Sequence, residues 1–213
     1  INRVAFRHPE ELIENIDAVS RFIARKDIGL EMICLCPAKD GRKYAVDAQG
    51  ELWRAYDFIS GGLSLEAPRD CNDFYQAAVA FGKFQQALAD FPAATLHETI
   101  PHFHDTEDRL NQLRASVEAD ACGRVRAVGP ELTFIFSREQ ELGTLCRMLR
   151  SGALPLRVTH NDTKLNNVLL DEQTGRARSV LDLDTVMPGL SAYDFGDAVR
   201  FGASSAAEDE TDL

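Results

Sequence analysis

The chain has 213 residues, of which 45% are hydrophobic, and a formal net charge of −11, from 34 acidic against 23 basic residues. This length can bury one substantial core or a small lobe packed on a larger one, and the acidic balance excludes the basic surface that nucleic acid or an anionic membrane requires. The sequence has no signal peptide and no apolar stretch long enough to span a membrane, and its five cysteines are odd in number and scattered, so we expect a cytoplasmic protein with reduced thiols.

The first part of the chain predicts one helix followed by short strands. Pro9 to Arg25 has its apolar residues on one face, with a proline and two glutamates at the start, which is typical of an amphipathic helix. Three apolar runs with glycine-marked turns between them come next: Met32 to Cys36, Lys43 to Val46 and Leu52 to Ile59. We expect these runs to form an antiparallel meander.

The middle of the chain predicts helices. Apolar residues recur on one face from about Asn72 to Asp90, with Asn72 or Asp73 as the N-cap. Further helices fit Thr106 to Ala119 and Glu131 to Leu149. The aromatic residues in these helices are expected to anchor the core and not to line a ligand site.

A polar loop follows the apolar run that ends at Val158, and it carries His160, Asp162 and Asn167 at fixed offsets. Residues 168–170 then begin a predicted β-hairpin, whose second strand brings Asp182 back to the loop. Phosphoryl transfer requires a carboxylate that faces the nucleophilic hydroxyl and oxygen ligands for the metal that bridges the phosphates. Asp162 fits the first role, and Asn167 with Asp182 fits the second.

The segment from Val158 to Asp184 resembles the catalytic loop of the aminoglycoside phosphotransferase and choline kinase superfamily, the small-molecule relatives of protein kinases. Within that superfamily, the runs Asp182 to Gly189 and Tyr193 to Gly202 resemble the N-acetylhexosamine 1-kinases. Those enzymes use ATP to phosphorylate the anomeric hydroxyl of N-acetylglucosamine or N-acetylgalactosamine. The resemblance implies an α+β, protein-kinase-like fold of two lobes. A partial N-lobe with an antiparallel sheet would cover residues 1–62, and a mainly helical, partial C-lobe with the catalytic-loop hairpin would cover residues 63–213.

The resemblance also implies cofactor sites. The run from Tyr56 to Gly62 is similar to the hinge of kinase-like enzymes, whose backbone binds the adenine of ATP. By this analogy Asp57, Phe58 and Ile59 are the nucleotide-binding residues. Mg²⁺ is expected at Asn167 and Asp182, because it prefers oxygen ligands.

Four polar residues in or beyond the loop have expected roles. Asp162 would align the acceptor hydroxyl and take its proton late, and Lys164 would contact the transferred phosphoryl group. His160 would tie the loop to neighbouring backbone. Asp197 resembles the family aspartate that braces the loop through hydrogen bonds.

One tripeptide looks like a metal-binding motif but is not assigned to the metal. Asp194-Phe195-Gly196 has the letters of the metal-binding tripeptide of protein kinases. Asp194 follows the predicted turn Met187-Pro188-Gly189, however, and stands at the entry to a predicted helix, where a capping role explains it. The metal is therefore assigned to Asp182, with Asp184 as the nearest rival because side chains two apart on a strand share a face.

Two questions stay open in the sequence. The resemblance implies a glycine-rich phosphate loop and a strand cation before Ile1, so we expect a fragment of a longer protein, with either Glu11 or Glu14 as the partner of that cation. The acceptor is expected to be a small molecule, most simply a sugar. The alternatives are choline, ethanolamine, homoserine or an aminoglycoside, or a non-catalytic kinase-like binding module, against which the intact set of Asp162, Asn167 and Asp182 argues.

Overall fold

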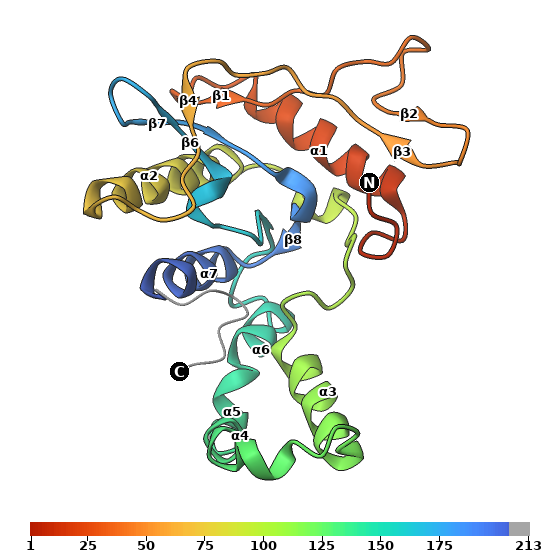
Figure 1. Cartoon of the computed structure of the whole chain (residues 1–213), viewed down its shortest axis with the longest axis vertical. Helices are drawn as coiled ribbons and strands as arrows, with labels where there is room; N and C mark the ends of the chain where they lie inside the picture. The colour runs from red at the N-terminus through yellow and green to blue at the C-terminus, as the bar shows by residue number, and fades with distance from the viewer. Residues whose placement is uncertain (205–213) are drawn as a thin grey trace. The chain divides into compact units, whose positions relative to one another are not determined.

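The computed structural model describes residues 1–204 of the chain (Figure 1). It divides into two compact units, one formed by residues 1–100 together with the chain from residue 156 onwards, and the other formed by residues 101–155. The predicted lobe boundary between residues 62 and 63 is a different division and stays a prediction. No helix in residues 1–204 is both long enough and apolar enough to cross a membrane.

The first helix forms as predicted. Helix α1 covers Pro9–Ile23, with the proline in its first turn and with Glu10 and Glu11 near its positively polarised start. Its apolar face is buried in the core of the first unit, and it includes Leu12, Ile16, Val19 and Ile23. The same face buries Asn15, whose side chain donates to the backbone carbonyls of His97 and Val186 at 2.8 and 3.0 Å.

The strands of the first unit form a four-stranded sheet of order β1-β7-β6-β4 and a separate pair of β2 with β3. Their bounds are Glu31–Met32 (β1), Ala45–Val46 (β2), Leu52–Trp53 (β3), Gly62–Leu63 (β4), Val168–Asp171 (β6) and Ala177–Val180 (β7). The predicted hairpin of β6 with β7 is confirmed as an antiparallel pair.

The predicted meander is only partly correct. The second and third runs pair antiparallel, as β2 with β3. The first run pairs instead with the end of the third run through an isolated bridge of Leu35 with Tyr56, and its β1 part pairs in parallel with β7. Because a strand has two edges that can hydrogen-bond, the first run connects the amino-terminal strands with the hairpin that follows the polar loop.

Helix α2 lies along the hairpin of β6 and β7 (Figure 1). It covers Cys71–Ala87, and its N-cap is Asp70, whose carboxylate accepts from the backbone N–H groups of Asn72 and Asp73. The expectation of Asn72 or Asp73 as the cap was therefore wrong by two or three residues. The buried face of α2 includes Phe81 and Phe84, which confirms the predicted core anchors at these two positions. The same prediction was wrong for Tyr75 and Phe134, whose side chains are exposed.

A further two-stranded sheet and one helix complete the first unit. Strand β5 (Arg157–Thr159) pairs antiparallel with β8 (Met187–Gly189), and helix α7 covers Ser191–Ala203. The predicted turn at residues 187–189 is therefore wrong. Pro188 is tolerated in β8 because the pair has only two strands, and a proline without an N–H can occupy an edge.

The second unit is helical. Helix α3 covers Thr106–Ala119 as predicted, whereas the single helix expected over residues 131–149 is divided into α4 (Gly129–Phe136), α5 (Glu139–Leu142) and α6 (Thr144–Arg150). One break falls at Gly143, where glycine lowers the helix propensity. A Cβ there would lie 2.4 Å from the Glu107 side chain, so the close approach of α3 requires this glycine.

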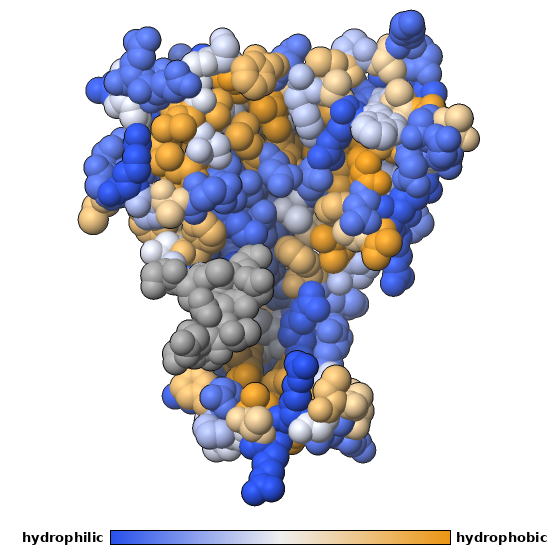
Figure 2. Space-filling view, in the orientation of Figure 1, coloured by the Kyte–Doolittle hydropathy of each residue, from blue (hydrophilic) through white to orange (hydrophobic). Residues whose placement is uncertain are grey.

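Short 3₁₀ turns complete the connections: η1 (Ala93–Thr95), η2 (Val125–Val128), η3 (Leu165–Asn167) and η4 (Leu183–Thr185). All five cysteines are free, and Cys71 and Cys122 are exposed. The face drawn in Figure 2 carries many hydrophilic side chains with apolar patches among them, as the high charge content requires. The mixture of small sheets and helices confirms the predicted α+β class.

Candidate functional site

Two carboxylates of α7 hold the backbone of the polar loop between β5 and β6. Asp194 accepts hydrogen bonds from the backbone N–H groups of His160 at 3.0 Å and Asn161 at 2.8 Å, and also from the side-chain amide of Gln85. Asp197 accepts from the backbone N–H of Thr163 at 2.7 Å. The three bonds from His160, Asn161 and Thr163 satisfy loop N–H groups that β-sheet pairing leaves unused.

The expected role of Asp194 as a helix cap was wrong. The N-cap of α7 is Leu190, and the Asp194 side chain is 4% exposed and turned toward the loop. Burial raises the pKa of Asp194, while the N–H groups of His160 and Asn161 oppose that rise. Asp194 thus braces the loop together with Asp197, and its place one turn into a helix gave no sequence signal for this contact.

The loop brings the two key side chains of the prediction together. Asn167 donates through Nδ2 to the backbone carbonyl of Asp162 at 2.8 Å and to its carboxylate Oδ2 at 2.9 Å. The other carboxylate oxygen, Oδ1, lies 3.2 Å from Nζ of Lys164. The Asp162 side chain remains 28% exposed, so it is held in place and still accessible to a ligand.

The backbone of Leu181 connects this loop with the end of β7. Its N–H donates to the carbonyl of Asn167 at 2.8 Å, and its carbonyl lies 2.9 Å from Nε2 of His160. The fully buried His160 ring also makes edge contacts with Phe81 and Phe84. Asp182 is the next residue, so its position relative to the loop depends on these two bonds.

Asp182 and Asn161 adopt an unusual backbone conformation. Their φ angles are 52° and 65°, in the left-handed region that most residues avoid. Only four non-glycine residues among the described ones have a positive φ, and these two lie on facing segments of the site. Such conformations persist where surrounding bonds enforce them, often at functional sites.

A third carboxylate adjoins Asp182. Asp184 forms an ion pair with Arg54, which follows β3 and was not among the predicted site residues. Burial raises the pKa of Asp184, the Arg54 guanidinium opposes that rise, and the neighbouring Asp182 carboxylate adds to it. Tyr56 lies under the guanidinium at 5.3 Å, and burial raises the pKa of its hydroxyl to about 12.

A cavity of about 350 Å³ extends from the predicted hinge to Asp182. Its lining combines apolar and polar side chains and consists of Ile33, Arg54, Tyr56, Asp57, Phe58, Ile59, Leu169, Leu181 and Asp182. The structure therefore places the three predicted nucleotide-binding residues and one predicted metal ligand on a single cavity. The volume lies within the range of small-molecule pockets.

Backbone groups are available at the hinge end of this cavity. The N–H of Asp57 donates to the carbonyl of Cys34 at 3.4 Å, whereas the N–H of Ile59 has no hydrogen-bond partner among the described residues. Phe58 between them is 91% exposed. A backbone segment with an unused N–H beside apolar side chains can bind a flat heterocycle by donating a hydrogen bond to one of its ring nitrogens.

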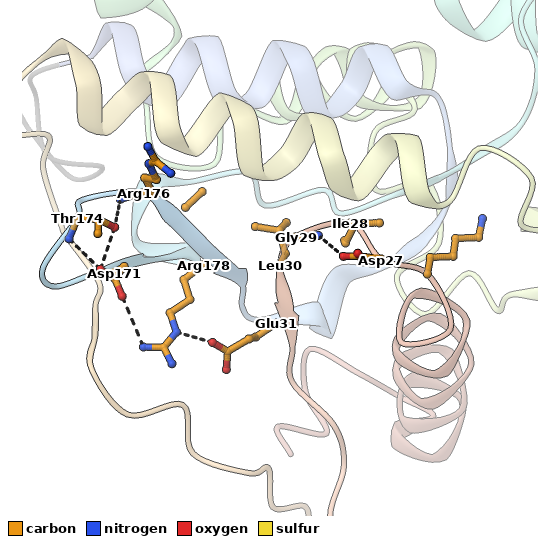
Figure 3. A pocket seen from close by; sticks show the side chains of 11 residues that line it. Asp27, Ile28, Gly29, Leu30, Glu31, Asp171, Thr174, Arg176 and Arg178 are labelled. Atoms are coloured by element: carbon orange, nitrogen blue, oxygen red, sulfur yellow. Dashed lines mark hydrogen bonds and ion pairs between the residues drawn. The ribbon is translucent and has the colours of Figure 1, made fainter.

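A second, larger cavity lies on the outer side of the β6–β7 hairpin and has a volume of about 560 Å³. Figure 3 shows that Arg178 extends between Asp171 and Glu31. Arg178 also donates to the carbonyl of Ser60 at 2.6 Å, so its charge is already neutralised by protein groups. None of Asp162, Asn167 and Asp182 lines this cavity, and we do not assign the chemistry to it.

The oxygen atoms at the site fit a hard divalent cation. Asn167 uses Nδ2 toward Asp162, which leaves its Oδ1 as a ligand, and Asp182 adds a carboxylate. No group of three or more His, Cys, Asp or Glu residues within 1–204 could hold a metal by itself. A cation with few protein ligands, completed by water and phosphate oxygens, is typical of Mg²⁺.

Comparisons with known proteins give the family and the fold of the chain. The family described as Phosphotransferase enzyme family (APH) matches residues 2–212. A solved structure of a microcompartment-associated aminopropanol kinase is 22% identical, with a TM-score of 0.56, and covers 88% of this chain and 58% of its own. The GDP complex of wild-type aminoglycoside 2′-phosphotransferase-IIIa is 12% identical, with a TM-score of 0.57, and the match covers 92% of this chain and 68% of that enzyme. Both share the fold, and this chain spans just over half the length of the first.

Proposed function

The chain belongs to the phosphotransferase enzyme family, and from that premise we propose that it carries the catalytic loop of an ATP-dependent small-molecule kinase. The observation that carries the proposal is the joint position of Asp162, Asn167 and Asp182. Asn167 holds Asp162 directly, and the bond from Leu181 N–H to the Asn167 carbonyl fixes the residue before Asp182. Phosphoryl transfer needs this combination of one aligned carboxylate and nearby oxygen ligands.

Asp162 is proposed to accept a hydrogen bond from the acceptor hydroxyl and to orient it for in-line attack. The bonds from Asn167 fix the carboxylate plane, and Lys164 at 3.2 Å balances its charge. Because phosphoryl-transfer transition states are loose, the carboxylate takes the proton late and needs no raised basicity. Lys164 is also placed to meet the transferred phosphoryl group.

The cavity between the hinge and Asp182 is proposed to bind the nucleotide. The backbone at Asp57, Phe58 and Ile59 would bind the adenine edge, and Leu169 and Leu181 would contact its faces. Asn167 and Asp182 would hold Mg²⁺, whose chemistry is to neutralise charge on the phosphates. His160 and Asp197, with Asp194, keep the loop in the geometry that both groups need.

The acceptor is proposed to be a small molecule with a free hydroxyl, most simply an N-acetylhexosamine phosphorylated at its anomeric position. This finer assignment rests on the resemblance of residues 182–189 and 193–202 to the N-acetylhexosamine 1-kinases. The net charge of −11 favours a cationic acceptor instead. The two similar solved structures are an aminopropanol kinase and an aminoglycoside phosphotransferase, so an amino alcohol or aminoglycoside is the second candidate.

Direct product analysis tests the proposal. The full-length protein is incubated with ATP and Mg²⁺ and a panel of N-acetylhexosamines, choline, ethanolamine, aminopropanol, homoserine and an aminoglycoside, and phosphorylated products are identified by mass spectrometry. A sugar 1-phosphate made by the wild type and absent with Asp162→Asn supports the full assignment. A phosphorylated amino alcohol supports the family function and overturns the sugar. No product with any acceptor would support the non-catalytic binding module.

A further inference from the structure

We propose that Arg54 binds a phosphate group of the nucleotide, so that the cavity contains its own anion-binding cation at the end nearest Asp182. The inference rests on the proposed nucleotide site and adds a specific residue to it. It concerns a side chain that follows β3, outside the catalytic loop and the metal-ligand pair.

The position of Arg54 is the first argument. Arg54 is the one cation among the described residues that line the 350 Å³ cavity. It precedes the hinge residue Asp57 by three positions and forms an ion pair with Asp184, which lies two residues after Asp182. A ligand that extends from the hinge to Asp182 therefore passes the Arg54 side chain.

The hydrogen bonds of Arg54 are the second argument. A guanidinium carries five N–H donors in a planar fork. In the described part of the chain, Nη2 bonds to Asp184, whereas Nη1 is buried without any hydrogen-bond partner. A buried donor without a partner loses its hydration and gains nothing in return, so such groups are rare in folded proteins. An acceptor oxygen supplied by a ligand would satisfy it.

The charge around the site is the third argument. Asp162, Asp182 and Asp184 place three carboxylates near the expected position of the phosphates. Phosphate groups in that field are repelled unless cations intervene. Lys164 contacts Asp162 at 3.2 Å and is proposed to meet the transferred phosphoryl group. Arg54 is a second cation for this field, and its planar fork can donate two parallel bonds to one phosphate.

Asp184 acquires a positioning role from this arrangement. Its carboxylate holds Nη2, and Tyr56 lies against the guanidinium at 5.3 Å. Both contacts restrict the rotation of a long side chain before the nucleotide arrives, which lowers the entropy that binding must remove. Asp184 is thus proposed to orient the anion-binding residue and not to serve as a metal ligand.

Equilibrium binding measured by calorimetry tests the inference without any turnover. The ligands are adenosine, ADP and ATP, each with Mg²⁺, and the variants are Arg54→Gln and the matched control Arg176→Gln, which removes an exposed arginine of the hairpin turn. We expect Arg54→Gln to weaken ADP and ATP by about 10- to 100-fold and adenosine by less than about twofold. Arg176→Gln should bind all three ligands as the wild type does.

Arg54→Gln removes the ion-pair partner of Asp184 and could lower the stability of the fold. The double variant Arg54→Gln/Asp184→Asn also removes the unpaired charge, so nucleotide binding can still be tested. It should fold, as its thermal transition reports, and should show the same selective loss for ADP and ATP. An equal loss for adenosine and ADP, or no loss at all, overturns the phosphate contact and leaves the proposed function intact. A wild type that binds none of the three ligands overturns both.

Discussion

The side-chain amide of Asn167 donates to both the backbone carbonyl of Asp162, at 2.8 Å, and its carboxylate Oδ2, at 2.9 Å. One side chain therefore fixes the orientation of the Asp162 carboxylate, while its own Oδ1 takes no part in these two bonds. The expected hydroxyl-binding and metal-binding groups are thus parts of one rigid element, η3 with the loop before it. A change in either residue should affect a different step, which makes their roles separable by experiment.

Asp162→Asn should lower kcat by about 10² to 10⁴-fold, because an amide cannot take the proton of the acceptor hydroxyl. The affinity for ATP should change little, since the bond from Asn167 Nδ2 can still be accepted by the new amide oxygen. Steady-state kinetics and nucleotide binding measured on the same preparation check both statements. Asp40→Asn, a change in an exposed loop, is the control, and near-normal turnover of Asp162→Asn would falsify the mechanism.

Variants of Asp182 and Asp194 should differ in how their turnover depends on the Mg²⁺ concentration. Asp182→Ala should lose metal-dependent turnover, because it removes a carboxylate from the end of the cavity. Asp194→Asn should keep a normal metal optimum. It should lose about 1–3 kcal/mol of folding stability, because the His160 and Asn161 N–H groups bond to different oxygens of the carboxylate and an amide keeps only one of them. The opposite ranking in the titration and in thermal unfolding would return the metal to Asp194.

Gly62→Ala should weaken nucleotide binding. A Cβ at Gly62 would lie 2.4 Å from two carbons of the Leu169 side chain, so Leu169 must move, and Leu169 lines the 350 Å³ cavity. Gly82→Ala on the exposed side of α2 is the matched control, because its Cβ meets nothing within 4 Å. The control should bind nucleotide normally and gain up to about 1 kcal/mol of stability from helix propensity. Unchanged adenosine affinity in Gly62→Ala would contradict the placement of the base beside Leu169.

Acid unfolding should depend on Asp73. Its hydrogen bonds to the Arg69 side chain lower the pKa of this carboxyl from 3.8 to about 2. Because the pKa is lower in the folded state, the unfolded chain binds the proton more readily. The contribution of Asp73 to the free energy of unfolding is therefore present above pH 4 and is lost as the pH falls toward 2. Asp73→Asn should therefore be less stable than the wild type at neutral pH, and the difference should shrink toward pH 2. Denaturant unfolding at several pH values measures it, and a difference that does not vary with pH would exclude this linkage.

The local elements were readable in the sequence because each depends on neighbouring residues. The periodicity of residues 9–25 and 106–119 predicted α1 and α3, and the turn residues 171–175 predicted the hairpin of β6 with β7. The offsets of Asp162 and Asn167 predicted that their side chains lie together, as they do, because a short loop between two strands keeps its side chains within reach of each other. The catalytic roles of these residues stay a prediction.

Contacts between distant segments were decided only by the tertiary structure. Arg54 meets Asp184 across 130 positions, and Asp194 reaches the backbone of His160 across 34. No local pattern marks such a partner, because any exposed arginine or helical aspartate looks the same until folding brings an opposite charge or an unused N–H beside it. The parallel pairing of β1 with β7 was hidden for the same reason. Short-range propensity thus set the elements and the chemistry of the loop, while burial and hydrogen-bond satisfaction across the fold selected the residues that complete the site.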